Sequence, residues 1–431
     1  MKTIRNPRPS TWSALSQRPV KDATSLNEQV AGVYSAIASD GDDALRRFIA
    51  SFEGRLADRL LLPKKALDSG AVNATAKEKA AVDMAYEAIY AAQVSQVLPE
   101  PASVFTQPGV EVWAERRPIE KVGLYIPGGT APLVSTVLML GIPARIAGVR
   151  QVIIATPPLS DGTLSPILCY ALQKVGAETV LLAGGMQAIA AMAIGTTSVP
   201  KVDKICGPGN QYVVAAKQYA QTIGVAIDMP AGPSEVMVIA DETAEPSFVA
   251  ADLLSQAEHG TDSQVVLATT SVDILRRTKQ EIVRQLKVLP RADVANQALK
   301  NSLFVLFDDI DPAIEFANEY APEHLILSVK QARDVSRRVV NAGSVFLGNY
   351  SPESAGDYAS GTNHTLPTNG WARTYSGLSV DSFSKWVYFQ ELSKDGLRSI
   401  SGTIDVLATS EGLEAHNQAV KVRFAGDKRN V

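Results

Sequence analysis

The chain has 431 residues, with 41 basic and 45 acidic side chains and a formal net charge of −4. This balance argues against nucleic acid as the main partner, because a phosphate backbone is bound by concentrated positive charge. Hydrophobic residues make up 46% of the chain and charged residues 20%, which excludes disorder over most of its length. The two cysteines are too few for a disulfide framework or a thiolate zinc cluster, so we expect a reducing, cytoplasmic location.

The first part of the chain is predicted to be helical. Residues 1–19 contain no apolar run of the kind found in signal peptides. Small apolar residues recur at helical spacing between Ala80 and Ala92, and Thr75 with Glu78 forms a capping-box pattern just before them. We therefore predict helices over residues 26–98.

An uncharged stretch follows from Val122 to Ala144 and is long enough to span a membrane. Glycine and proline cluster within it around Pro127 and Gly128, which a helix exposed to lipid does not tolerate well. A buried strand, a tight turn and a helix fit the pattern better, and we predict no membrane partner.

From Lys121 onward, short β-branched runs alternate with helical segments, and glycine or proline follows the early runs. Alternation of this kind is the signature of parallel α/β sheets. A break at residues 229–233 separates two predicted α/β units, 121–233 and 234–376. The predicted strands are 122–126, 151–155, 179–183 and 202–206 in the first unit, and 236–240, 264–269, 303–307, 324–328 and 344–347 in the second.

The periodic pattern stops over residues 351–370, a segment rich in Gly, Ser, Thr and Asn that contains Asp357 and His364. A loop of that length inside a folded domain is usually functional or disordered, and the two titratable residues favour function. Residues 401–422 again follow a helical pattern.

Only four histidines occur, and each is either a surface residue or part of a site. Gln256 and His259 share a helix face because they are three residues apart. Together with Asp357 and His416 they offer only nitrogen and oxygen ligands, which suit zinc or a harder divalent ion. No HExxH or CxxC motif is present, so spacing alone gives a weak signal for this metal site.

The adjacent pair Glu323 and His324 is a candidate acid–base pair, because imidazole titrates near neutrality and a carboxylate can take a proton from water. Neighbouring side chains of an extended segment point to opposite faces, so both reach one site only where the backbone turns. Pro322 makes an irregular entry plausible. A solvated pair at the start of a strand is the alternative.

Three glycine turns, at Gly128-Gly129, Gly184-Gly185 and Gly207-Pro208-Gly209, each follow a predicted strand and precede a helix. Backbone N–H groups at such turns can hold a phosphate. None matches the GxGxxG dinucleotide fingerprint, and plain strand-to-helix connections remain equally compatible with the pattern.

Taken together, these segments closely resemble the histidinol dehydrogenase family, and the matching motifs follow the family's order along most of the chain. They are VGLYIPGGTAPL (122–133), KVDKICGPGNQYV (201–213), DMPAGPSEV (228–236), DLLSQAEHG (252–260), YAPEHL (320–325), SPESAGDYASGTNH (351–364) and EGLEAH (411–416).

The resemblance implies an NAD-dependent four-electron oxidation of L-histidinol to L-histidine through bound L-histidinaldehyde. It also implies site residues: zinc ligands Gln256, His259, Asp357 and His416; an acid–base pair Glu323 and His324; NAD contacts Tyr125, Gln187 and Asn210; and substrate contacts Ser234, His364 and Glu411, together with His324 and the zinc ligands.

The implied fold is two Rossmann-like α/β units with atypical nucleotide-binding motifs, a helical N-terminal region and a small C-terminal helical tail. The implied domains are an arm (1–23), a discontinuous zinc and substrate domain (24–120 with 234–376), an NAD domain (121–233) and a tail (377–431). The family's homodimer implies that Glu411 and His416 serve the partner's site.

Other functions remain open at this stage. A zinc hydrolase on a similar frame would use Glu323 to activate water and would need no NAD. A zinc-stabilised scaffold without activity, and a dehydrogenase of another amino alcohol, are the remaining alternatives.

Overall fold

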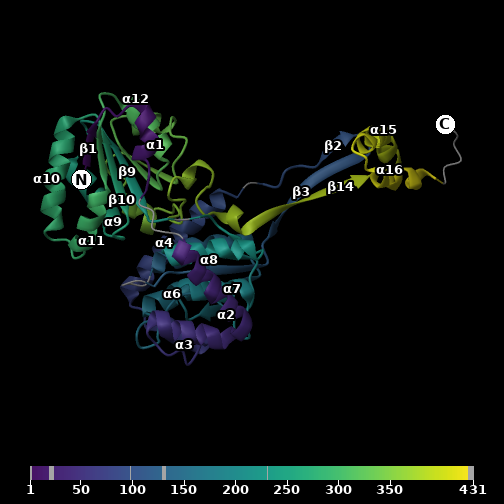
Figure 1. The fold of residues 1–431 in the computed structure, drawn as a ribbon, viewed down its shortest axis with the longest axis horizontal. Helices are drawn as coiled ribbons and strands as arrows, with labels where there is room; N and C mark the ends of the chain where they lie inside the picture. The colour runs from purple at the N-terminus through teal and green to yellow at the C-terminus, as the bar shows by residue number, and fades with distance from the viewer. Residues whose placement is uncertain (1, 19–23, 98, 129–132, 231, 426–431) are drawn as a thin grey trace. The chain divides into compact units, whose positions relative to one another are not determined.

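The computed structural model describes residues 2–18, 24–97, 99–128, 133–230 and 232–425 (Figure 1). Part of the predicted arm (19–23) and Gly129 of the first glycine turn lie outside these ranges. The chain divides into two units, Met1–Gln96 with Ile119–Phe383, and Val97–Pro118 with Ser384–Val431. None of the described helices has the length and hydropathy that a membrane span requires.

A six-stranded, fully parallel sheet carries the second set of predicted strands, in the order β1-β11-β10-β9-β12-β13. The prediction of these strands is confirmed, and only the N-terminal strand β1 was not predicted. The strands are β1 (Lys2–Arg5), β9 (Glu235–Ala240), β10 (Gln264–Thr269), β11 (Leu303–Leu306), β12 (His324–Ser328) and β13 (Ser344–Leu347).

A five-stranded parallel sheet carries the first set, in the order β6-β5-β4-β7-β8. The four predicted strands are confirmed, and the two-residue edge strand β8 is additional. The strands are β4 (Lys121–Tyr125), β5 (Gln151–Ala155), β6 (Thr179–Leu181), β7 (Lys204–Cys206) and β8 (Ala226–Ile227).

The two sheets share one strand order. Numbered along the chain from β4 in one sheet and from β9 in the other, both run 3-2-1-4-5, with β1 added at an edge of the larger sheet. This is the doubly wound arrangement that reverses direction between its first and fourth strands. The predicted class of two Rossmann-like α/β units is therefore confirmed.

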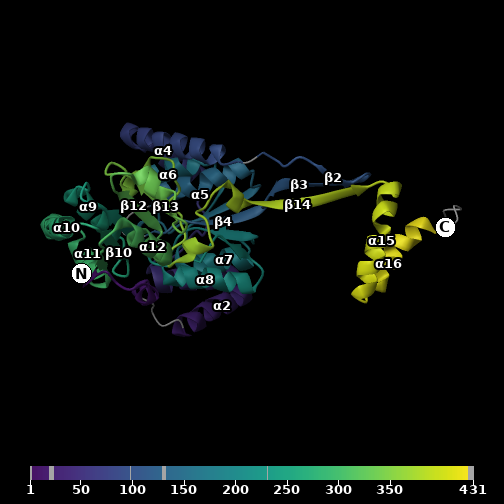
Figure 2. The same cartoon turned by 90° about the horizontal axis from the view of Figure 1, so that it is seen from above.

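Helices cover both faces of each sheet, as parallel strands require (Figure 2). In the five-stranded sheet, α7 and α8 cover one face, and α5 and α6 cover the other. In the six-stranded sheet, α9, α10 and α11 cover one face, and α1, α12 and α13 cover the other. Their bounds are α1 (Trp12–Leu15), α5 (Val134–Ala147), α6 (Pro166–Lys174), α7 (Gly185–Ile194), α8 (Gln211–Thr222), α9 (Pro246–Ala257), α10 (Val272–Leu286), α11 (Ala292–Ala298), α12 (Ile310–Tyr320) and α13 (Ala332–Ser336).

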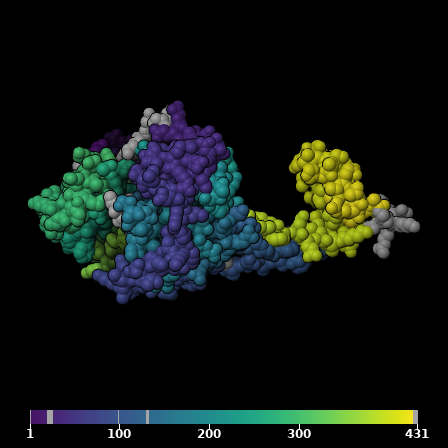
Figure 3. All heavy atoms as spheres, turned by 90° about the horizontal axis from the view of Figure 1, so that it is seen from below, coloured from purple at the N-terminus to yellow at the C-terminus, as the bar shows by residue number. Residues whose placement is uncertain are grey.

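The predicted N-terminal helices are present as α2 (Thr24–Phe48), α3 (Lys64–Val72) and α4 (Ala76–Ser95), and the Thr75–Glu78 capping box forms. Helix α2 packs on α7 and α8, α3 packs on α6, and α4 packs on α5. The three helices form part of the outer surface of the first unit (Figure 3). Their contacts are with the helices that cover the five-stranded sheet, whereas the predicted domains group residues 24–120 with 234–376.

The second unit contains an antiparallel ribbon, formed by β2 (Val104–Gln107), β3 (Val110–Pro118) and β14 (Ser384–Leu392), and two helices, α15 (Lys394–Ser410) and α16 (Glu414–Lys421). The helical tail is confirmed, but it is preceded by β14, which the sequence did not predict. Both faces of β14 are partly exposed, so the strand lacks the clean apolar alternation that reveals a half-buried strand.

The segment 351–370 is also more ordered than predicted. Glu353–Tyr358 form a short helix, α14, which turns Glu353 and Asp357 to the same side because the two residues are four apart. The rest of the segment contains no helix or strand among its described residues.

A buried ion pair fixes the glycine turn after β7. Lys217 of α8 pairs with Asp228, and its Nζ donates to the Gly207 carbonyl at 2.8 Å, while Asp228 accepts from the Gly207 N–H at 2.7 Å. Gly207 has φ +133°, and a Cβ there would lie 2.2 Å from the Tyr125 carbonyl oxygen. Only glycine fits this turn, and the ion pair holds both of its polar backbone groups.

We predict that Lys217→Met lowers the free energy of unfolding by about 3–5 kcal/mol, because it leaves the Asp228 carboxylate buried without its countercharge. Urea denaturation measures this change. The matched control is Lys64→Met, which removes an exposed partner of Asp68 and should change stability by less than about 1 kcal/mol. Equal effects of the two substitutions would contradict a special role for the buried pair.

Candidate active site

A cavity of about 550 Å³ opens in the first unit between the two sheets. The loops after β4 and β7 line it from the carboxyl ends of the five-stranded sheet. The residues at the amino ends of β9 and β12 line it from the six-stranded sheet. It brings together eight predicted site residues, namely Asn210, Ser234, Gln256, His259, Glu323, His324, Asp357 and His364.

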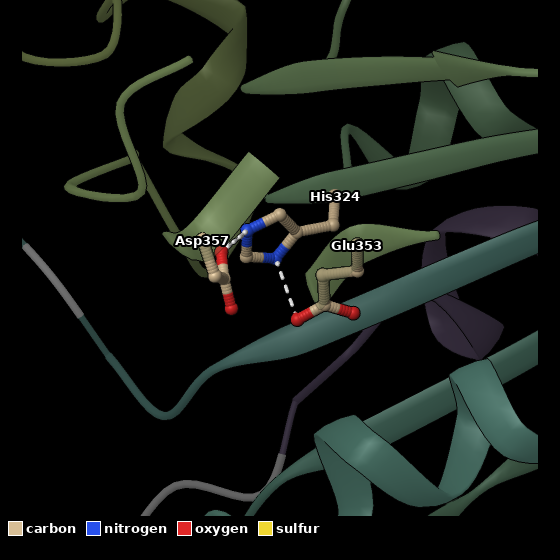
Figure 4. A group of neighbouring side chains, drawn as sticks. All are labelled: His324, Glu353 and Asp357. Atoms are coloured by element: carbon tan, nitrogen blue, oxygen red, sulfur yellow. Dashed lines mark ion pairs between the residues drawn. The ribbon is translucent and has the colours of Figure 1, made fainter. Parts of the chain in front are cut away.

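His324 lies at the centre of the buried part of this site, between two acidic side chains of α14 (Figure 4). Its Nδ1 is 3.5 Å from Glu353 Oε1 and its Nε2 is 3.6 Å from Asp357 Oδ1. The possible ligand atoms of these three residues all lie within 4.8 Å of one another, close enough to share a metal ion.

The acidic neighbours govern the protonation of His324. Burial alone lowers the pKa of this imidazole, but the charges of Glu353, Glu323 and Asp357 outweigh burial and raise the pKa to about 10. Burial likewise raises the pKa of Glu323 and of Glu353 to about 8, against the opposing charge of His324. The cluster therefore retains protons near neutrality that the isolated carboxyl groups would lose.

The backbone turn that the Glu323-His324 pair requires is present. Ala321 adopts φ +51°, a left-handed conformation unusual for alanine, immediately before Pro322. Glu323 then points its Oε2 at the backbone N–H of Glu235, 2.8 Å away. Both members of the pair consequently line the same cavity.

Gln256 is fully buried at the end of α9, and its two amide atoms have no hydrogen-bond partner among the described residues. His259 follows α9 and lines the cavity, and burial lowers the pKa of its imidazole. Asp357 Oδ1 and His324 Nε2 are also buried without a hydrogen-bond partner in the described structure. Such a concentration of unpartnered nitrogen and oxygen atoms fits a site that a cation or a polar ligand completes.

His364 connects the two sheets across the cavity. One ring nitrogen lies 3.1 Å from the Asp357 carbonyl oxygen and the other 3.1 Å from Thr136 Oγ1 on α5. Burial lowers the pKa of His364, so the neutral ring is favoured. Two hydrogen bonds thus fix the ring's orientation at the cavity wall.

The predicted NAD contacts Tyr125, Gln187 and Asn210 line a second cavity of about 830 Å³, at the carboxyl ends of β4, β5 and β6. Asn210, after β7, extends the cavity to the switch point between β4 and β7, where doubly wound sheets bind ligands. Asn210 lines both cavities, and its side chain caps α8 by accepting from two backbone N–H groups. The two cavities therefore adjoin at this residue.

The backbone N–H groups of the turn before α7 were a possible phosphate site, but two of them already donate hydrogen bonds to side chains. Gly184 N–H donates to Glu53 at 3.0 Å, and Gly185 N–H donates to the Tyr125 hydroxyl at 2.9 Å. Gln187 also donates to Glu53, at 3.0 Å. This helix N-terminus is thus already capped by the protein itself, as is the turn at Gly207.

Glu411 and His416 lie in the second unit, at the end of α15 and in α16, and both are exposed. All the other predicted site residues belong to the first unit.

Two acidic residues were missed by the sequence reasoning, one in contact with His324 and one lining the larger cavity. Glu353 is 2% exposed and faces His324, and its spacing of four residues from Asp357 was the available signal. Glu53 caps the turn before α7 from a distant helical segment, and no pattern in the sequence connects the two.

The strand order, the two adjoining cavities and the buried imidazole–carboxylate cluster define a two-sheet α/β enzyme with a titratable centre beside the ligand-binding edge of one sheet. Comparisons with known proteins narrow this class. The family model described as histidinol dehydrogenase matches residues 16–424. The chain belongs to the histidinol dehydrogenase family.

Individual relatives agree over nearly the whole length. The histidinol dehydrogenase of Bacteroides thetaiotaomicron is 49% identical over 424 residues, which cover 98% of this chain and 99% of the relative. The chloroplastic histidinol dehydrogenase of Arabidopsis thaliana is 49% identical over 419 residues, or 96% of this chain and 89% of that protein. The crystal structure of histidinol dehydrogenase from Elizabethkingia anophelis superimposes with a TM-score of 0.94 at 49% identity, covering 98% of both chains.

We predict that Gln256→Leu raises the free energy of unfolding of the metal-free protein by about 1–3 kcal/mol, because it replaces a buried unpartnered amide by a similar apolar shape. The matched control is Gln187→Leu, which removes the donor to Glu53 and should lower stability by a similar amount. Denaturation in the presence of a chelator measures both, and a loss of stability in Gln256→Leu would contradict the prediction.

Proposed function

We propose that the protein oxidises L-histidinol to L-histidine in two NAD-dependent steps through bound L-histidinaldehyde, with zinc as its metal. The observation that carries the proposal is the 49% identity over nearly the full length to histidinol dehydrogenases, whose motif residues line adjoining cavities here. The two free, buried cysteines suit a reducing cytoplasm, which we propose as its location.

The donor set fits zinc, because the unpartnered buried atoms of Gln256 and Asp357 lie in the cavity that His259 lines. We propose Gln256, His259, Asp357 and the partner subunit's His416 as ligands. When bound, the ion supplies positive charge and coordination positions for the imidazole and amine of histidinol. That charge beside Asp357 opposes the carboxylates that raise the pKa of His324, which favours the neutral imidazole.

His324 is proposed to take the proton from the substrate hydroxyl. Its Nδ1 faces three oxygens, those of the Glu353 and Glu323 carboxylates and the Glu235 carbonyl at 3.4 Å, so Nδ1 carries the hydrogen in the neutral ring. Nε2 is then the basic nitrogen. Abstraction of the hydroxyl proton by a positioned imidazole allows oxidation to the aldehyde level.

Glu323 is proposed to activate water in the second step, because an aldehyde must add water before it can be oxidised to an acid. The raised pKa of this buried carboxyl group, about 8, matches the acceptance and return of a proton near neutrality. Retention of the reactive aldehyde in the cavity between the two steps would limit its side reactions in solution.

Tyr125, Gln187 and Asn210 are proposed to hold NAD in the larger cavity, and the bound dinucleotide supplies the hydride acceptor for both steps. Asn210 places this cavity next to the substrate cavity. Because side chains cap the turn before α7, we infer that the phosphates bind elsewhere along the cavity. Residues 121–233 form the NAD domain in this proposal.

Ser234, His364 and Glu411 complete the proposed substrate site. We propose a homodimer in which each site receives Glu411 and His416 from the other subunit, since both residues are exposed in the second unit. We also propose the remaining functional divisions of the chain, namely the arm (1–23), the combined domain (24–120 with 234–376) and the tail (377–431).

The decisive experiment follows NADH formation by absorbance with zinc-loaded protein, NAD and L-histidinol, and counts two NADH per histidine formed. A panel of other amino alcohols controls for substrate identity. A zinc hydrolase or an inactive scaffold would give no NADH, and a screen of esters and amides would separate those two.

We expect Asp357→Asn to lower zinc affinity about 10-fold or more, because it removes a charged ligand. Calorimetric titration of metal-free protein with zinc measures this directly. Asp252→Asn, which changes a largely buried acid on α9 that the proposal does not use, is the control and should retain wild-type affinity. Unchanged affinity in Asp357→Asn would exclude Asp357 as a ligand.

Co-expression of His259→Asn with His416→Asn tests the shared site. In a mixed dimer one site receives both defects and the other receives neither, so random pairing should recover roughly a quarter of wild-type activity per site. Each variant alone serves as the inactive control. No recovery from a verified mixed dimer would refute the shared site and leave a role of His416 within its own subunit as the alternative.

A further inference from the structure

Arg18 is a buried side chain near the N-terminus, and neither the sequence motifs nor the proposed chemistry uses it. Its side chain is 7% exposed and forms a two-pronged ion pair with Glu235, itself 1% exposed. Arg18 Nε lies 2.7 Å from Glu235 Oε2, and Nη2 lies 2.8 Å from Oε1. Paired hydrogen bonds of this kind fix both position and orientation.

The backbone of Glu235 directly contacts the proposed acid–base pair. Its N–H donates to Glu323 Oε2 at 2.8 Å, and its carbonyl oxygen lies 3.4 Å from His324 Nδ1. The residue whose side chain is held by Arg18 therefore supplies the hydrogen-bond donor for the Glu323 carboxylate.

Arg18 also holds the segment that leads into Glu323. Its Nη2 donates to the Tyr320 carbonyl at 2.7 Å, and its guanidinium lies 3.7 Å from the centre of the Tyr320 ring. Ala321, the next residue, has the left-handed conformation that aims Glu323 into the cavity. A single guanidinium thus anchors both the donor to the Glu323 carboxylate and the backbone turn before it.

We infer that Arg18 and Glu235 are positioning residues for Glu323, acting through the Glu235 backbone and the Tyr320–Ala321 turn. The inference rests on the proposed function, in which Glu323 serves the aldehyde-oxidising step. Small displacements of a catalytic group cost large factors in rate, on the order of 100-fold for 1 Å. Loss of the ion pair should therefore slow that step more than alcohol oxidation, because His324 keeps its contact with Glu353 at 3.5 Å.

The experiment measures each step separately in Arg18→Met, Arg18→Lys and Glu235→Gln, by rapid-quench oxidation of histidinol and by oxidation of histidinaldehyde supplied directly. We expect Arg18→Met to slow aldehyde oxidation about 10- to 100-fold, with alcohol oxidation, zinc content and the KM for histidinol within about threefold of wild type. Arg18→Lys keeps one charged donor and should recover part of the loss. Arg338→Met, which breaks an exposed pair with Asp311, is the control.

A double-substitution cycle separates positioning from general destabilisation. If Arg18 acts through Glu323, then Arg18→Met should add no further loss in a Glu323→Gln background. Additive losses, or equal slowing of both steps, would overturn the inference. Should Arg18→Met fail to fold, Arg18→Lys and Glu235→Gln provide the same cycle.

A structural readout keeps the inference independent of the proposed reaction. In a crystal structure of Arg18→Met, which removes the ion pair, we expect the Glu323 carboxylate to leave the Glu235 N–H. A retained bond near the present 2.8 Å would overturn positioning whatever the enzyme oxidises. Absence of NADH formation by the wild-type protein would instead refute the proposed function and leave this measurement decisive for Arg18.

Discussion

The arrangement of this protein depends on one constraint of parallel sheets: their strands are buried on both faces, so only the strand ends are free for chemistry. The strands β4 and β9 are fully or nearly buried beneath helices. Ser234 and Glu323 accordingly lie just before strands and His324 begins one, while Gln256 and His259 lie at or just after the end of α9 and Asp357 lies on the short helix α14. Both sheets contribute residues to the site, because the cavity lies between them and is lined by strand ends of each.

The same site illustrates a conflict between stability and function. A folded protein normally gives each buried polar atom a partner, yet Gln256, His324 and Asp357 retain unpartnered atoms in the described structure. Elsewhere the protein satisfies its buried charges carefully, as the Lys217–Asp228 and Arg18–Glu235 pairs show. Three of the residues that keep such atoms, Gln256, His324 and Asp357, line one cavity, where a ligand would complete them.

Sequence reasoning succeeded where local patterns are strong. Strands such as 264–269 and 324–328 are continuous apolar runs with clear breaks, and the Thr75–Glu78 capping box depends on neighbouring residues only. Strand β14 and helix α14 were missed, because one is exposed on both faces and the other is hidden in a Gly- and Ser-rich segment. The roles of site residues came from family resemblance, whereas the partnership of Glu53 with Gly184 required the fold, since 131 positions separate them.

The shared strand order of the two sheets has a counterpart in how their edges are used. At the carboxyl ends of β9 and β12 in the six-stranded sheet, the protein's own groups hydrogen-bond to one another: Asp241 accepts from the Lys330 N–H at 2.8 Å, and Ser328 donates to Asn349 at 2.9 Å. The six-stranded sheet lines the candidate site at the amino ends of β9 and β12 instead. Two sheets of the same strand order thus line the candidate site from opposite strand ends, so inspection of the carboxyl ends alone would overlook the residues that the six-stranded sheet supplies.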